Sequence, residues 1–198
     1  MPAKSNDLTG YEVIVAVCGG IAAYKTCAIV SALVQRGAGV TVAMTESATQ
    51  FVGPVTFQAL SARRVLTSLW SPDAFFDPQH IRLTENADGF LIAPATANII
   101  GKIAAGIADD LISTLVISAR PPVLLAPAMN DRMWENPIVQ ANVQKLRELG
   151  YVFVGPAEGW MACRTVGMGR MAEPAEIVQA LVARLKSAPP KGRVPRDV

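Results

Sequence analysis

A cysteine stands in an unusual setting near the C-terminal end of the sequence, in the segment "WMACRTVGMGR" (Trp160 to Arg170). Core cysteines usually lie inside periodic runs of apolar residues. Cys163 instead lies among glycines and beside arginines, surroundings that favour a partly exposed and ionisable thiol. From the residues alone two interpretations stay open. Cys163 is a reactive group, or its thiol packs against the body of the protein.

Two glycines follow a strand-like run in "VCGGIAAYK" (Val17–Lys25) and precede a helix start. Glycines let backbone amides approach a phosphate, and the first turn of a helix adds about half a positive charge. The fingerprint GxGxxG of dinucleotide-binding proteins is absent, so a mononucleotide phosphate fits better than a dinucleotide. The alternative interpretation is a plain tight turn between strand and helix.

Hydroxyl and amide side chains follow the next two predicted strands. In "MTESAT", Thr45 and Ser47 either bind a phosphate or ribityl group or cap a helix. In "APATAN", a flat polar ring fits over the small Ala95, with Thr96 and Asn98 as hydrogen-bonding groups. Thr96 is also suited to a helix N-cap, a role that does not exclude the first.

An asparagine stands at a further strand end, in "APAMNDRMWENP" (Ala126–Pro137). An amide framed by Pro127 and Met129 is well placed to bind a carboxylate, so Asn130 is a candidate substrate ligand. A helix start capped by Asn130 or Asp131 is also expected here. The neighbouring methionines and tryptophan are equally consistent with a core.

The only histidine, His80, occurs in "DPQHIRL", at or just before a short predicted helix. Any histidine-based acid–base chemistry therefore depends on this one residue. Lone histidines are more often structural or exposed than catalytic, and that alternative stays open.

Short β-branched runs alternate with longer helical stretches along the chain. The strands are expected at Tyr11–Val17, Gly39–Met44, Gly89–Ala93, Val123–Ala126 and Tyr151–Val154. The helices are expected at about 21–36 and at Thr96–Ala105, Asp110–Ala119, Pro137–Leu149 and Pro174–Lys186. This alternation predicts an α/β fold with parallel βαβ units, right-handed crossovers and one doubly wound sheet. Pro94 is expected to end the third strand.

In such sheets the ligand crevice lies beyond the carboxyl ends of the strands. All the motifs described above follow predicted strands, except the one around His80. The segment from Gly155 to Glu173 is a long stretch without a predicted element, of the kind that is usually functional or disordered. Its glycines suggest the turns of a flap. We expect a polar extension at residues 1–10, one domain at residues 11–186 and a disordered tail at residues 187–198.

Composition excludes several function classes. The chain has 198 residues, a net charge of +2 and 51% hydrophobic residues, without a dense Lys/Arg run that would bind nucleic acid. No apolar segment is long enough to span a membrane, and the N-terminus lacks the apolar core of a signal peptide. The 3 cysteines show no CxxC spacing, which argues against a disulfide framework or a metal site. A reducing cytoplasm is the expected compartment.

Together, "GGIAAYK", "PATAN", the lone "HI", "PAMNxxMW" and "ACxxxGxGRMAEP" resemble the homo-oligomeric flavin-containing cysteine decarboxylases, from about Val13 to Leu185. The resemblance implies FMN bound in a flavodoxin-like or Rossmann-like single domain. It also implies a site between the subunits of a homotrimer, alone or within a higher assembly of trimers. The most similar members decarboxylate 4′-phosphopantothenoylcysteine to 4′-phosphopantetheine in coenzyme A biosynthesis.

The resemblance assigns roles residue by residue. The phosphate end of FMN would contact Gly19, Gly20, Ile21 and Thr45, and the flavin would lie near Ala95, Thr96 and Asn98. His80 would be the active-site base or orienting group, and Asn130 would bind the substrate carboxylate beside Met133. Ala162 and Arg164 would flank Cys163 in a substrate clamp. Glycine is usual in the family at the position of Arg164, and a basic residue is frequent at that of Glu85.

In this chemistry a cysteine carboxylate leaves only after the flavin has removed two electrons from the cysteine side chain. The product-reducing enzymes then return those electrons, and the clamp cysteine, here Cys163, supplies a proton. Two other functions stay open. One is the oxidative decarboxylation of a peptide with a C-terminal cysteine, which does not need Cys163, and the other is a non-enzymatic flavin-binding regulatory subunit.

Overall fold

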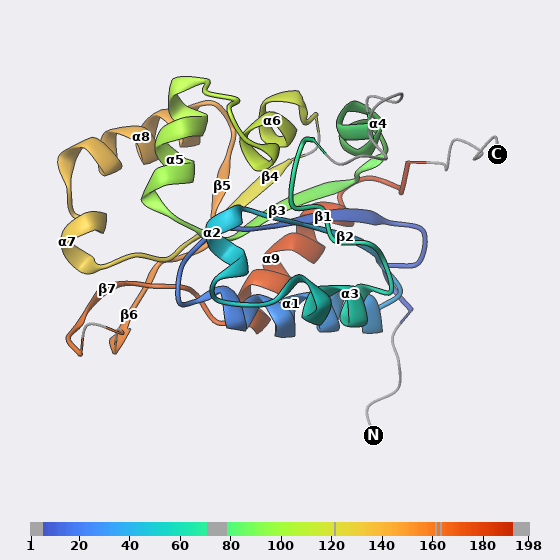
Figure 1. Cartoon of the computed structure of the whole chain (residues 1–198), viewed down its shortest axis with the longest axis horizontal. Helices are drawn as coiled ribbons and strands as arrows, with labels where there is room; N and C mark the ends of the chain where they lie inside the picture. The colour runs from blue at the N-terminus through green and yellow to red at the C-terminus, as the bar shows by residue number, and fades with distance from the viewer. Residues whose placement is uncertain (1–5, 71–78, 121, 161, 163, 192–198) are drawn as a thin grey trace.

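The computed structural model describes residues 6–70, 79–120, 122–160, 162 and 164–191. Its centre is a five-stranded parallel sheet in the order β2-β1-β3-β4-β5 (Figure 1). The strands are β1 (Glu12–Val17), β2 (Gly39–Met44), β3 (Gly89–Ala95), β4 (Val123–Pro127) and β5 (Val152–Phe153). The order reverses direction at β1, so the predicted doubly wound α/β fold is confirmed.

Helices cover both faces of the sheet (Figure 1). One face carries α1 (Ala23–Gln35), α3 (Pro54–Ser61) and α9 (Pro174–Leu185). The other carries α4 (Gln79–Asn86), α5 (Ala97–Ala105), α6 (Leu111–Ser118) and α8 (Pro137–Glu148). The short helices α2 (Glu46–Thr49) and α7 (Asp131–Trp134) follow the ends of β2 and β4.

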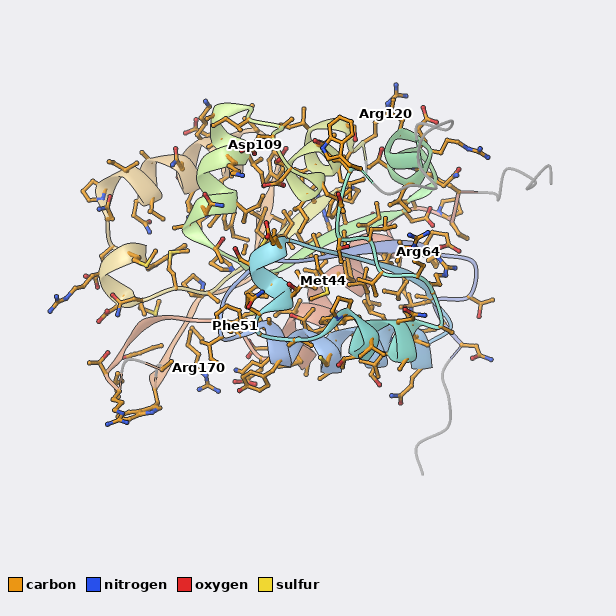
Figure 2. All side chains as sticks on the ribbon, in the orientation of Figure 1. Met44, Phe51, Arg64, Asp109, Arg120 and Arg170 are labelled. Carbon is orange, nitrogen blue, oxygen red and sulfur yellow. The ribbon has the colours of Figure 1, made fainter. Side chains whose placement is uncertain are left out.

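The strand sequences explain this layering, because successive side chains of a strand point to opposite faces. In β1, Val13 and Val15 belong to the core beneath α1 and α9, whereas Ile14 belongs to the core beneath α5 and α6. Every residue of β3 is buried, as expected of a central parallel strand that is covered on both sides. Figure 2 shows Met44 between the layers and Arg120 and Arg170 at the outer edge.

The expectation that Pro94 ends the third strand is wrong. β3 continues to Ala95, which pairs with Pro127 after an irregularity in the ladder between Ile92 and Ala95. Proline lacks the amide hydrogen that a regular ladder needs, and the register shift absorbs this loss. Hydrogen bonding resumes one residue later, where the Ala128 amide donates to the Ala95 carbonyl at 3.1 Å.

The segment expected to contain only turns forms an antiparallel hairpin of β6 (Ala157–Trp160) and β7 (Val166–Arg170). It projects away from the end of the sheet below α7 (Figure 1). The glycines conceal these strands in the sequence, since Gly159 pairs with Gly167 where β-branched residues would normally signal a strand. Residues 161 and 163 lie outside the described residues.

Helix α3 was not expected either. It begins with Pro54 in its first turn and buries Phe57 completely against the sheet. At the C-terminal end, residues 187–191 make hydrogen bonds to the domain through Ala188 and Lys191, and the remainder of the predicted tail lies outside the described residues. In the part of the chain that is described, no helix has both the length and the apolar character to cross a membrane.

Candidate active site

The loops that follow β1, β2, β3 and β4 enclose a cleft of about 1320 Å³ at the carboxyl ends of the strands. Residues of the β6–β7 hairpin complete its wall. The sequence-predicted residues that line the cleft are Gly19, Gly20, Ile21, Thr45, Thr96, Asn98, Asn130, Met133 and Ala162. Stretches far apart in the sequence therefore converge on one site. It lies at the carboxyl ends of the strands, where doubly wound sheets bind their ligands.

Other predicted residues lie elsewhere. Ala95 is fully buried in β3 and is not among the lining residues of the cleft. Arg164 is exposed, with a φ of 65°, at the end of the hairpin beyond the lining residues. Cys163 falls outside the described residues. His80 is the second residue of α4.

The loops after β1 and β2 form a cradle in close mutual contact. A Cβ placed on Gly19 would lie 2.4 Å from the Cβ of Ser47, so no larger residue fits there without moving the second loop. The Thr45 amide donates to the Val17 carbonyl at 3.0 Å, and its hydroxyl accepts from the Ala48 amide at 3.1 Å. Thr45 is therefore the N-cap of α2, as one of its two interpretations predicts.

The first turns of two helices and the glycine loop point polar groups at the same space. The amides of Gly19, Gly20 and Ile21 donate no hydrogen bond within the described part of the chain. The amides of Glu46 and Ser47 at the start of α2 likewise donate no hydrogen bond within the described residues, whereas the Ala48 amide is used by the Thr45 cap. Backbone amides and hydroxyls in this arrangement suit a phosphate monoester.

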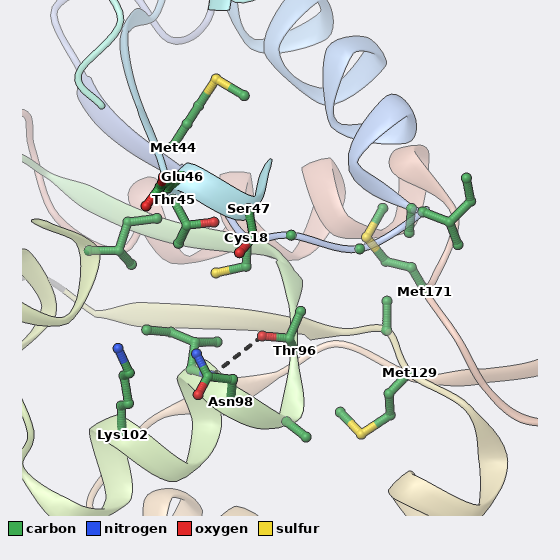
Figure 3. A pocket seen from close by; sticks show the side chains of 18 of the residues that line it. Cys18, Met44, Thr45, Glu46, Ser47, Thr96, Asn98, Lys102, Met129 and Met171 are labelled. Atoms are coloured by element: carbon green, nitrogen blue, oxygen red, sulfur yellow. Dashed lines mark hydrogen bonds between the residues drawn. The ribbon is translucent and has the colours of Figure 1, made fainter. Parts of the chain in front are cut away.

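The floor of the cleft comes from the end of β3 and the start of α5. The Thr96 hydroxyl caps α5 by accepting from the Ile99 amide at 3.4 Å. Figure 3 shows Asn98 and Lys102 rising from α5 towards the wall that carries Met44 and Glu46. Such amide and ammonium groups at the edge of an apolar cleft fit a flat heteroaromatic ring with polar edges.

Cys18 lies between the cradle and this floor (Figure 3). Its thiol is buried, and burial together with the nearby negative charge of Asp110 raises its pKa to about 12. The thiol is consequently protonated at neutral pH and packs as a small apolar group.

A charged cluster missed by the sequence analysis lies at the cleft wall. Lys102 donates to Asp109 at 2.7 Å and to Asp110 at 2.6 Å, which links α5 to the start of α6. Burial alone would raise the pKa of Asp110, but hydrogen bonds from Lys102 and Ser113 outweigh it and lower that pKa. Hydrogen bonds from the two carboxylates raise the pKa of Lys102. The acidic pair before a helix was the available signal, because aspartate is a preferred N-cap.

Asn130 caps α7, with its side-chain oxygen accepting from the Arg132 amide at 3.0 Å. The loop before it is held by the hairpin, because the Met129 amide donates to the Gly169 carbonyl at 2.9 Å. Gly169 has a φ of 154°, and a Cβ there would lie 2.2 Å from the Met129 carbonyl oxygen. The base of the hairpin and the asparagine loop are thus one unit.

A second contact fixes the base of the hairpin to the domain. Glu173 forms ion pairs with Lys25 of α1 and with Arg170 at the end of β7. The hydrogen bond from Lys25 lowers the pKa of Glu173. Lys25 and Arg170 both line the cleft, so the ion pairs hold its rim.

The structure does not bring all predicted catalytic residues together. Helix α4, which carries His80, and helix α7, which Asn130 caps, lie on opposite sides of the molecule (Figure 1). Within one chain the two helices are therefore far apart.

Comparison with known proteins agrees with this geometry. The bifunctional coenzyme A biosynthesis protein CoaBC of Bacillus subtilis (strain 168) is 47% identical over 94% of this chain. CoaBC of Escherichia coli (strain K12) is 44% identical over 89% of it. The chain spans about half the length of these relatives, 47% and 44% respectively.

Solved structures match along nearly their whole length. A PPC decarboxylase mutant complexed with pantothenoylaminoethenethiol has a TM-score of 0.79 and 30% identity, covering 90% of this chain and 99% of its own. The FMN-dependent cysteine decarboxylase SpaF has a TM-score of 0.75 and 31% identity, covering 89% and 98%. The family model described as Flavoprotein matches residues 1–186. With the glycine cradle, the doubly wound sheet and these matches in agreement, the chain belongs to the Flavoprotein family.

Proposed function

We propose that this protein is an FMN-dependent decarboxylase that converts 4′-phosphopantothenoylcysteine to 4′-phosphopantetheine in coenzyme A biosynthesis. The observation that carries the proposal is the single cleft in which the glycine cradle, Asn130 and the base of the hairpin meet. Similarity to CoaBC proteins and to PPC decarboxylase supports the choice of substrate.

The residues of the cleft fit FMN. The backbone amides of Gly19, Gly20 and Ile21 and the hydroxyls of Thr45 and Ser47 would hold its phosphate. Gly19 lies so close to Ser47 that a side chain at this position would not fit between the two loops. Thr96 and Asn98 would lie along the ring system, on the floor that α5 supplies. When bound, FMN supplies a two-electron acceptor that makes loss of the carboxylate possible.

Asn130 would donate its side-chain amide hydrogens to the substrate carboxylate. Its oxygen accepts from the Arg132 amide as the cap of α7, which orients the side chain at the edge of the cleft. Half-exposed Met133, one turn on, would provide apolar contact with the substrate chain.

The hairpin would close over the substrate and bring Cys163 to the reacting carbon, where the thiol would donate the proton of the reductive half-reaction. Its base is fixed at Gly169 and Glu173, while Trp160 and Ala162 line the cleft. Exclusion of water from the site would strengthen the hydrogen bonds to the carboxylate.

A homotrimer in the cytoplasm would complete the site. Since α4 and α7 lie on opposite sides of one chain, His80 of one copy would face Asn130 of the next. Large apolar side chains such as Ile21, Tyr24 and Trp70 are exposed around the cleft, as expected of a surface that a partner covers.

Product masses test the proposal. The flavin-loaded protein is incubated with 4′-phosphopantothenoylcysteine, and 4′-phosphopantetheine is expected. Cys163→Ser should still release carbon dioxide but accumulate a product lighter by two hydrogens, the ene-thiol. Conversion of a peptide with a C-terminal cysteine instead, with equal turnover by Cys163→Ser, would favour the peptide decarboxylases. No conversion of either substrate by the flavin-loaded protein would contradict the enzymatic role.

A further inference from the structure

The segment that follows α9 is bound to the far end of the helix that carries His80. The Lys191 Nζ donates to the Ala87 carbonyl at 2.8 Å and to the Glu85 carbonyl at 3.2 Å. The Lys191 amide also donates to the Asp88 carboxylate at 2.7 Å. All these acceptors belong to the last turn of α4 or to the residues directly after it.

Helix α4 is a short helix that needs such support. It has 8 residues, and isolated helices of this length are marginal in water. Among its described side chains, only Thr84 is fully buried, and Leu83 is partly so. Its last turn contains no basic residue to neutralise the partial negative charge of the helix end. Lys191 supplies that cation from elsewhere in the chain.

The same segment is anchored to the sheet. Ala188 accepts from the Tyr11 hydroxyl at 2.9 Å, at the entrance to β1. Asp88 spans the gap, because its second oxygen accepts from the Glu12 amide at 2.7 Å. One chain of hydrogen bonds therefore runs from β1 through Asp88 and Lys191 to the end of α4.

We propose that residues 187–191 form a strap that positions α4, and with it His80, for the decarboxylation, with Lys191 as the positioning residue. This inference rests on the proposed function for its catalytic part. The strap itself is a property of the fold and is measurable without substrate.

The strap is tested with Lys191→Met in the flavin-loaded protein. Lys186→Met is the matched control, since Lys186 is a nearby lysine that pairs with Asp7 at 2.6 Å and makes no bond to α4. Hydrogen exchange of the α4 amides should be about tenfold faster in Lys191→Met and unchanged in the control. The value of kcat should fall about fivefold with the flavin content retained, and Lys191→Arg should restore both.

The outcomes test the strap and the positioning of His80 separately. Unchanged exchange in α4 would overturn the strap. Faster exchange with unchanged kcat would overturn the positioning of His80 while leaving the proposed function intact. If the unmodified protein converts no cysteine substrate, the proposed function fails. In that case the hydrogen exchange of the α4 amides alone tests whether the strap holds α4.

Discussion

Asn130 has two tasks that a single substitution can separate. Its side-chain oxygen caps α7, and its NH2 group is assigned to the substrate carboxylate. Aspartate caps helices as well as asparagine does, so Asn130→Asp keeps the first task. It replaces the second with a repulsion between two carboxylates.

We therefore expect Asn130→Asp to lower kcat/KM by more than about 100-fold, about 3 kcal/mol of transition-state stabilisation, at unchanged melting temperature. Asn136→Asp is the matched control, because Asn136 caps α8 by accepting from the Ile138 amide at 2.9 Å and is not among the described lining residues. Steady-state kinetics of both variants decide the matter. Equal losses in the two would assign Asn130 a purely structural role.

Two adjacent glycines differ in what they tolerate. A Cβ on Gly19 would overlap Ser47, whereas a Cβ on Gly20 would lie 3.7 Å from the Thr96 methyl and 3.9 Å from the Pro94 ring, both ordinary contacts. Gly19→Ala is expected to weaken FMN binding by at least about tenfold, and Gly20→Ala much less. Fluorescence titration of the flavin-free proteins with FMN measures both constants. Unchanged FMN affinity in both variants would mean that the cradle is not where the phosphate binds.

At the scale of elements, the contact between α5 and α6 depends on charge. The folded-state pKa of Asp110 is lowered, so its stabilisation is present above the unfolded-state pKa of about 4 and is lost as pH falls through the folded value. The pKa of Lys102 is raised, so its stabilisation is present below the unfolded-state value of about 10.4 and is lost as pH rises through the folded value.

Asp110→Asn keeps an N-cap for α6 but removes the ion pair with Lys102. We expect it to lower the free energy of unfolding by about 0.5–1 kcal/mol at pH 7, a modest figure because the pair is partly exposed to solvent. Urea unfolding at several pH values measures this. The difference from the unmodified protein should shrink below pH 4, and a difference that grows in acid would contradict the pKa direction.

The strands and long helices followed from the sequence because burial imposes a strong pattern on them. β3 is apolar throughout, and the positions of α8 and α9 within one residue of expectation reflect the start signals at Pro137 and Pro174. The β6–β7 hairpin did not follow, since its pairing is satisfied by glycines whose side chains give no pattern. The base of the hairpin is fixed by a backbone hydrogen bond to Met129, and backbone hydrogen bonds leave no pattern of side chains in the sequence.

The candidate site shows the same division. Residues at strand ends were predictable because topology alone brings them together, as it does for Gly19, Thr96 and Asn130. The cluster around Lys102 was missed, because an acidic pair before a helix is already explained as an N-cap and does not by itself reveal a lysine partner. The hydrogen bonds of Lys191 to the end of α4 join residues about 100 positions apart, and no local sequence pattern predicts them.

At the scale of the whole molecule, a complementation experiment tests the proposal that the site is shared between copies. His80→Asn and Asn130→Asp should each be inactive alone. Mixed, dissociated and reassembled, they should recover about a quarter of the wild-type sites, those with an intact residue from each copy. Mixing without reassembly is the control. If reassembly recovers nothing although each variant binds FMN, each copy builds its own site.

The measurement that tests the central claim most directly is the release of labelled carbon dioxide from 4′-phosphopantothenoylcysteine that carries the label in its cysteine carboxylate. Protein with FMN and the same protein stripped of it are compared side by side. The account predicts one labelled carbon dioxide for each 4′-phosphopantetheine formed, and only with FMN present. Release without flavin, or none from the fully loaded protein, would contradict it.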